Sequence, residues 1–103
     1  MVSGQISIRG IAIVTGAAQG IGRSVALRLA DDGFDVAVND LPSKKDIIDS
    51  VVNEIQLKGR RSLAALADVT EDGDVKAMVA TVVTEFGGLD VVGVPRTSTM
   101  YYP

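Results

Sequence analysis

The sequence contains no cysteine and no histidine among its 103 residues, and these two absences exclude several kinds of chemistry. Without cysteine the chain forms no disulfide and carries no thiol nucleophile. Without either residue it has none of the nitrogen and sulfur ligands that ordinary zinc sites use. A catalytic histidine is excluded as well.

Positive charge is also scarce, with 10 Lys and Arg against 13 Asp and Glu and a formal net charge of -3. Such a chain lacks the basic surface that neutralises phosphates, so nucleic acid is a poor candidate for a partner. No uncharged apolar run approaches the roughly 20 residues that cross a bilayer, and residues 1–10 lack the apolar core of a signal peptide. We therefore expect a cytoplasmic protein with no membrane contact.

The remaining composition is that of a single globular domain. Hydrophobic residues make up 47% of the chain and charged residues 22%, which argues against intrinsic disorder. With 3 prolines and 11 glycines, the sequence has the composition of neither a linker nor a fibrous repeat. The chain should fold.

Apolar residues alternate along the chain between the spacing of strands and that of helices. Short runs of small and β-branched residues predict strands at residues 10–15, 34–40, 61–67 and 89–94. Helical spacing between them predicts three helices, which stop at Gly33, Gly59 and Gly87. With right-handed crossovers this order builds a parallel sheet with helices on its faces. We predict an α/β fold, a partial Rossmann-type doubly wound sheet with strand order 3-2-1-4.

The helical spacing also predicts which side chains face the core. The expected stripes are Ile21, Val25 and Leu29 in the first helix, Ile47, Ile48, Val51, Val52 and Ile55 in the second, and Val75, Met78, Val79, Val82 and Phe86 in the third. Ser43 and Thr70 are the expected N-caps of the second and third helices.

A glycine-rich segment, Thr-Gly-Ala-Ala-Gln-Gly-Ile-Gly at residues 15–22, lies between the first strand and the first helix. Backbone amides at such a helix N-terminus can hold a pyrophosphate. Gly16 would allow the tight turn, Gly20 the approach of the ligand, and Gly22 the close packing of helix and strand. The alternative is a tight connection that binds nothing, since glycine is common wherever a chain turns sharply.

Asp40 ends the second strand, where a dinucleotide-binding fold places a carboxylate that accepts hydrogen bonds from the adenosine ribose. A 2′-phosphate there would face like charge, and Gln19, Leu41 and Pro42 supply no cation to hold it. Asp40 therefore favours NAD over NADP. Its alternative interpretation is a turn aspartate ahead of Leu41 and Pro42.

These residues, together with Asn39-Asp40, Asp68-Val69 and Gly88-Leu89-Asp90, resemble the N-terminal part of the short-chain dehydrogenase/reductase family over residues 8–92. The nearest likeness is to the acetoin (diacetyl) reductases and the 3-oxoacyl reductases. The resemblance implies that Asp68 bonds the adenine amino group and that the Val69 backbone lies beside the ring. The cofactor-binding residues it implies are Gly16, Gln19, Gly20, Ile21, Gly22, Asp40, Asp68 and Val69.

Two alternatives stay open at this point. Asp68 is also explained as an aspartate at the start of a helix, ahead of Thr70. S-adenosylmethionine enzymes likewise carry a glycine-rich turn after the first strand and an acid after the second, although Thr15, the glycine spacing and Asp68-Val69 favour the dehydrogenase.

After Val92 the sequence departs from the family, which continues with Asn-Asn-Ala-Gly where this chain reads Gly93-Val94-Pro95. We expect a half-domain at residues 1–92 and an unrelated tail at 93–103, produced by truncation or a misread transcript. The family's catalytic Ser and Tyr-(X)3-Lys have no counterpart here. Tyr101 and Tyr102 lack the lysine that would lower a phenol pKa from about 10.

Two functions follow from this sequence. The first is an incomplete NAD-dependent oxidoreductase whose parent acts on CH–OH and C=O groups. The isolated chain would then bind at best the adenosine half of NAD and would not catalyse the reaction. The second is a non-catalytic module that associates with itself or with a full-length relative through an open fourth strand and a sheet face covered by one helix.

Overall fold

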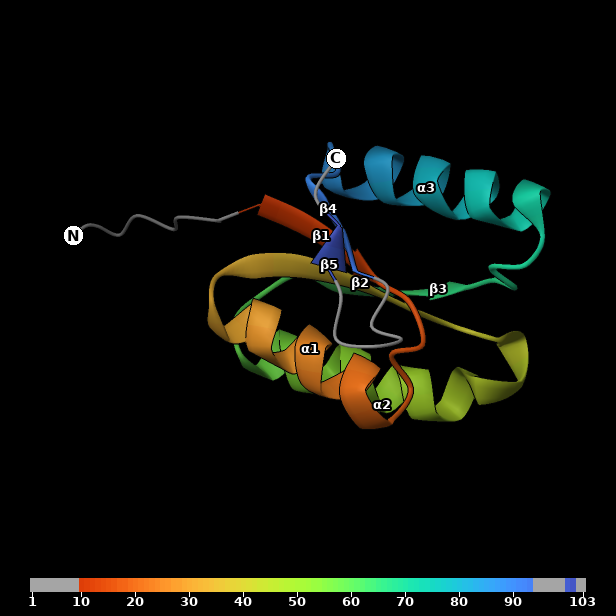
Figure 1. The fold of residues 1–103 in the computed structure, drawn as a ribbon. Helices are drawn as coiled ribbons and strands as arrows, with labels where there is room; N and C mark the ends of the chain where they lie inside the picture. Colours follow the sequence, from red (N-terminus) through yellow and green to blue (C-terminus); the bar gives the residue numbers. More distant parts are fainter. Residues whose placement is uncertain (1–9, 94–99, 102–103) are drawn as a thin grey trace.

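The computed structural model describes residues 10–93 and 100–101, in which a sheet carries helices on both faces (Figure 1). The elements are β1 (Gly10–Val14), α1 (Gly20–Asp31), β2 (Phe34–Asp40), the short 3-10 helix η1 (Pro42–Lys44), α2 (Lys45–Leu57), β3 (Ser62–Leu66), α3 (Asp72–Phe86), β4 (Val91–Gly93) and β5 (Met100–Tyr101). The alternation predicted from the apolar spacing is confirmed.

The sheet has the strand order β3-β2-β1-β4-β5, and its first four strands run parallel. The predicted α/β fold and the order 3-2-1-4 are therefore confirmed. Val14, at the end of the central strand β1, is level with Val38 on one side and with Gly93 on the other. The segments that follow these strands consequently leave the sheet along one edge.

The expectation that the fourth strand forms an open edge was wrong. β5 pairs antiparallel with β4, with Val92 opposite Tyr101 and Gly93 opposite Met100. An unpaired strand edge exposes backbone donors and acceptors, and here the chain's own C-terminal segment supplies their partners. Residues 94–99 and 102–103 of the predicted tail lie outside the described part of the chain.

Helices α1 and α2 cover one face of the sheet, and their buried side chains pack on β1 and β2. In α2 the predicted stripe is confirmed at Ile48, Val51 and Ile55, which are fully buried, whereas Ile47 is 43% exposed and Val52 is partly buried. In α1 the buried line is shifted by one residue, to Gly22, Ala26 and Ala30, while Ile21 is half exposed. Small residues on this line let the helix approach the strands closely, which a row of large side chains would prevent.

On the other face, α3 is the helix that packs on the sheet within the described residues (Figure 1). Met78 and Val82 are its buried side chains, and Val79 and Phe86 pack against them at the border. They contact Ile13 of β1, among other residues of this cluster. The prediction of one helix on this face agrees with the described fold.

Neither expected N-cap caps a helix. Ser43 lies inside η1, and α2 starts two residues later, because Pro42 fixes the backbone angle of a preceding short turn. Thr70 lies ahead of α3, whose N-cap is Glu71. The Thr70 hydroxyl donates instead to Asp68 Oδ1 at 2.6 Å.

An ion cluster around the buried Asp35 joins β2 to the residues just before β3. Asp35 is 1% exposed, and its Oδ2 accepts from Arg61 Nε at 2.8 Å while Oδ1 accepts from Arg60 Nη2 at 3.0 Å. The Arg61 guanidinium also lies 4.8 Å from the ring centroid of Phe86. Burial alone would raise the pKa of Asp35, but hydrogen bonds from Arg61 and Arg60 outweigh it and hold that pKa below its usual value.

Candidate functional site

The predicted phosphate loop, residues 15–19 together with the first turn of α1, has the backbone shape its glycines were expected to provide. Gly16 and Gly20 have φ values of +63° and +61°, a left-handed region that side chains disfavour. A Cβ added at either would meet nothing within 4 Å, so the main chain there is open to a ligand. A Cβ on Gly22 would lie 2.0 Å from the Gly16 carbonyl oxygen, so only glycine fits between turn and helix.

The N-terminus of α1 leaves backbone amides free for a ligand. Gln19 is the N-cap, in extended conformation, and the first helical bond runs from Arg23 N to Gln19 O at 3.4 Å. The amides of Gly20, Ile21 and Gly22 precede that bond and therefore have no acceptor in the helix. They also lie at the positive end of the helix dipole, which favours an anion.

Asp40 is brought to this loop, as the shared edge of parallel strands predicts. Its Oδ2 accepts from Ala18 N at 3.2 Å and its Oδ1 from Leu41 N at 2.8 Å. Next to it, Ala17 N donates to the carbonyl oxygen of Asn39 at 2.8 Å. Two consecutive loop amides are thus bound to the two last residues of β2.

Two residues that belong to the sequence motifs, but were given no binding role, support the site. Asn39 is 2% exposed, and its Nδ2 donates to Ala65 O at 2.8 Å and to Ala67 O at 3.2 Å, so it joins β2 to β3 beside the loop. Thr15 donates twice to Gly93 O, from its backbone N at 3.0 Å and from Oγ1 at 3.3 Å. The available signal for Asn39 was a polar residue in a strand that is otherwise apolar.

Asp68 and Val69 follow β3, at the same edge of the sheet. Both the backbone N and the hydroxyl of Thr70 donate to Asp68 Oδ1, and these bonds hold the pKa of Asp68 below its usual range. Among the described contacts, none joins the Asp68 carboxylate to the glycine loop. Val69 lies closer to the glycine loop than the Asp68 carboxylate does, since it lines an apolar cavity together with Thr15 of that loop.

That cavity has a volume of about 330 Å³ and lies between α3 and the strands β1 and β4. Its lining residues are Ile13, Thr15, Val69, Val75, Met78, Val79 and Val92. Thr15, the first residue of the glycine loop, is one of its lining residues, and the lining is nearly all apolar. A flat, weakly polar group such as a nucleobase suits such a lining better than a charged one does.

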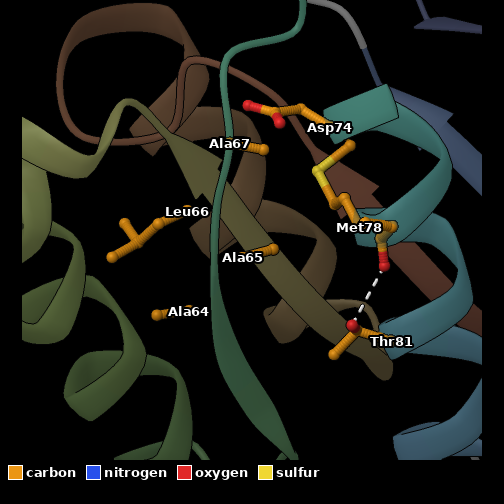
Figure 2. Close-up of a pocket in the computed structure, with 8 residues that line it drawn as sticks. Ala64, Ala65, Leu66, Ala67, Asp74, Met78 and Thr81 are labelled. Atoms are coloured by element: carbon orange, nitrogen blue, oxygen red, sulfur yellow. Dashed lines mark hydrogen bonds between the residues drawn. The ribbon is translucent and has the colours of Figure 1, made fainter. Parts of the chain in front are cut away.

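A second cavity, of about 240 Å³, lies between α3 and the edge strand β3 (Figure 2). Alanines of β3 form one wall, and Asp74, Met78 and Thr81 of α3 form the other. Its polar side chains are already bonded, because Asp74 Oδ2 accepts from Asp68 N and Thr81 Oγ1 donates to Ala77 O. We assign it no ligand.

The described residues hold no group of three or more acidic side chains placed to bind a metal ion. Among the helices within residues 10–93, none combines the length and the apolar character that a bilayer-crossing helix needs.

Known proteins share the sequence pattern and the fold of this chain. The sequence model of the short chain dehydrogenase family matches residues 10–95. That is more than half of the chain, which therefore belongs to the short-chain dehydrogenase family. The family resemblance predicted from the glycine loop and its acidic partners is confirmed.

Curated relatives include a short-chain dehydrogenase/reductase of Armillaria gallica, 48% identical over 92 residues that cover 89% of this chain and 35% of the relative. The 3-oxoacyl-(acyl-carrier-protein) reductase FabG of Staphylococcus aureus is 52% identical over 81 residues, which cover 79% of this chain and 32% of the relative. The chain thus spans about a third of the length of the curated relatives it matches.

Solved structures give the same result. A dehydrogenase/reductase of Sinorhizobium meliloti aligns with a TM-score of 0.80 at 32% identity, over 85% of this chain and 34% of the other. A blue fluorescent protein from a metagenomic library, solved in complex with NADPH, aligns with a TM-score of 0.78 at 35% identity, over 85% of this chain and 36% of the other.

Membership of the family implies a nicotinamide dinucleotide as the cofactor. The residues present fit the phosphate part of such a molecule. The loop offers a surface without side chains at Gly16 and Gly20, and it is followed by free amides at a helix N-terminus.

Proposed function

We propose that this chain forms the adenosine-binding part of an NAD-dependent short-chain oxidoreductase. The amides of Gly20, Ile21 and Gly22 would hold the pyrophosphate, with Gly16 and Gln19 shaping the turn. Asp40 would accept the ribose hydroxyls, and Asp68 and Val69 would contact the adenine. When bound, NAD would accept a hydride from a CH–OH group or, once reduced, return one to a C=O group.

The observation that carries this proposal is the position of Asp40 against the loop. Its carboxylate is bonded to the Ala18 amide, so the predicted ribose acceptor and the predicted phosphate site lie side by side. Each carboxylate oxygen accepts one backbone amide and has a further lone pair, which leaves capacity for the two hydroxyls of a ribose.

The same carboxylate supports NAD over NADP. A 2′-phosphate would lie against a negative charge, and burying it there without a cation is costly. Arg23 of α1 is paired with Glu54, and Lys45 of α2 is paired with Asp49. Selectivity would therefore come from repulsion at Asp40 as much as from attraction of the ribose.

Titration calorimetry of the full chain with NAD, NADP and ADP-ribose tests the proposal. We expect binding of ADP-ribose and NAD, and weaker binding of NADP. Asp40→Ser should lower the affinity for NAD and reduce the ratio of the affinities for NAD and NADP. Asp46→Ser is a matched change on the exposed first turn of α2, and it should change neither the NAD affinity nor that ratio. Equal binding of NAD and NADP by the unmodified chain would contradict the proposed selectivity.

We also propose that residues 1–103 alone do not catalyse hydride transfer, because the sequence has no Tyr-(X)3-Lys to donate and accept the proton. Reduction of a small ketone by the purified chain with NADH would overturn this. The non-catalytic alternative predicts association on a sizing column without nucleotide binding, whereas nucleotide binding without association would favour the oxidoreductase.

A further inference from the structure

We infer that Asp40 is also a positioning residue for the phosphate loop, because its carboxylate holds the Ala18 amide and so fixes the turn from which α1 starts. This inference rests on the proposed function, since it concerns how the same site is shaped. It assigns Asp40 an effect on the pyrophosphate, which the carboxylate itself would not touch.

The loop has few other restraints between β1 and α1. Thr15 N is bonded to Gly93 O and Ala17 N to Asn39 O. Beyond Ala18, no further backbone bond joins the described residues to the loop until Arg23 N donates to Gln19 O. The bond from Ala18 N to Asp40 Oδ2, at 3.2 Å, is thus the last restraint before the amides of Gly20 to Gly22.

Local burial supports a structural role for the bond. The side chains of Ala17 and Ala18 are 0% and 1% exposed and belong to the core between α1, α2 and the sheet. Without the carboxylate, the backbone amide of Ala18 would lose its acceptor, while the buried side chain of Ala18 would still hold the residue in the core. An unpaired amide of this kind favours a different turn.

Asparagine cannot replace aspartate here, although it has nearly the same shape. Asp40 accepts on both oxygens, from Leu41 N on Oδ1 and from Ala18 N on Oδ2. An asparagine has one oxygen, so its NH2 group must face one of these two donors. The Leu41 bond is the shorter, at 2.8 Å, so we expect the oxygen to stay there and the bond to Ala18 to be lost.

Amide hydrogen exchange by NMR and binding of inorganic pyrophosphate, both on the full chain, test the inference. In Asp40→Ala and Asp40→Asn, Ala18 should exchange at least about tenfold faster relative to Ile13 in β1, which reports global opening. Affinity for pyrophosphate, which has no ribose, should fall by about tenfold in both variants, although both also remove a negative charge that repels the anion. Asp46→Asn, an exposed acid on α2, should change neither value.

Unchanged Ala18 exchange in both variants would overturn the inference. So would faster exchange with unchanged pyrophosphate affinity, because Asp40 would then act on the ribose alone. If the unmodified chain binds none of pyrophosphate, ADP-ribose and NAD, the proposed function fails and the inference fails with it. If the unmodified chain binds these ligands but the Asp40 substitutions have no effect, only the inference about Asp40 fails. Asp40→Asn keeps the volume of the side chain, so both measurements can be made on it if Asp40→Ala does not fold.

Discussion

The side-chain amide of Asn39 donates to the carbonyl oxygen of Ala65, its neighbour across β2 and β3, at 2.8 Å. A second bond, to Ala67 O, continues past the end of β3. One buried side chain thus fixes the end of β2, where Asp40 lies, and the end of β3, just before Asp68, and both aspartates are predicted to contact the cofactor.

Replacing Asn39 should therefore destabilise the sheet at the site. In Asn39→Leu, the apolar side chain removes two buried hydrogen bonds and places no donor against Ala65 O or Ala67 O. We expect the free energy of unfolding to fall by about 1–3 kcal/mol. Urea denaturation measures it, with Asn53→Leu on the exposed face of α2 as the control. Equal effects of the two substitutions would contradict this role for Asn39.

The buried Asp35 should contribute to the pH dependence of the free energy of unfolding. Because its pKa is lower in the folded protein than the ordinary value of 3.8, its contribution is complete above that value and is lost as the pH falls through the folded pKa. The free energy of unfolding should therefore decrease on acidification below about pH 4. Denaturant titrations from pH 7 downward measure this slope.

Asp35→Asn should reduce the slope and cost about 3 kcal/mol at neutral pH, because it leaves Arg60 largely buried without its counter-charge. Asp49→Asn, which breaks the exposed pair with Lys45, should cost less than about 1 kcal/mol. A slope that is the same in Asp35→Asn as in the unmodified chain would assign the acid dependence to other carboxylates.

Gly22 should be the least replaceable glycine of the loop. Gly22→Ala puts a Cβ against the Gly16 carbonyl oxygen, so α1 must move away from the turn, at a cost of about 1–3 kcal/mol and with weaker ADP-ribose binding. Gly73→Ala is the matched change in the first turn of α3, where a Cβ meets nothing within 4 Å, and it should be neutral or slightly stabilising. Thermal denaturation and calorimetry compare the two.

The cavity of Figure 2 offers a stabilising substitution. Ala77 of α3 is one of its lining residues, and Ala77→Leu adds apolar volume to a space of about 240 Å³ that Met78 also lines. We expect a gain of about 1 kcal/mol. Ala80→Leu makes the same change at an exposed position of α3 that does not line the cavity, and should give no such gain. A loss of stability in Ala77→Leu would mean that β3 cannot accommodate the larger side chain.

Sequence periodicity predicted the elements that local patterns determine. β2 was predicted at residues 34–40 and forms there, because its alternation and the flanking Gly33 and Pro42 mark both ends. The buried line of α1 was displaced by one residue, since large side chains give the stronger pattern while small ones make the closest contact. Ser43 is not a cap because Pro42 starts a short 3-10 turn there, and the Thr70 hydroxyl bonds to Asp68 instead of capping α3.

The candidate site was predictable as a location and not as a set of contacts. Parallel strands end at one edge, so Asp40 had to lie near the glycine loop. The bond from Ala18 N to Asp40 depends on a side-chain rotamer, which periodicity does not specify. The sequence also did not predict the ion cluster of Asp35. Arg60 and Arg61 lie far from Asp35 in the sequence and bond to it only because β2 and β3 pair.

The central strand β1 takes one neighbour from β2, which follows it closely, and the other from β4, with Thr15 and Gly93 separated by 78 positions. On the ribosome, the segment up to β3 emerges long before β4 does. One side of β1 therefore stays unpaired in the nascent polypeptide until β4 has left the ribosome. A chaperone that recognises extended apolar segments would find its target there, during that interval and not afterwards.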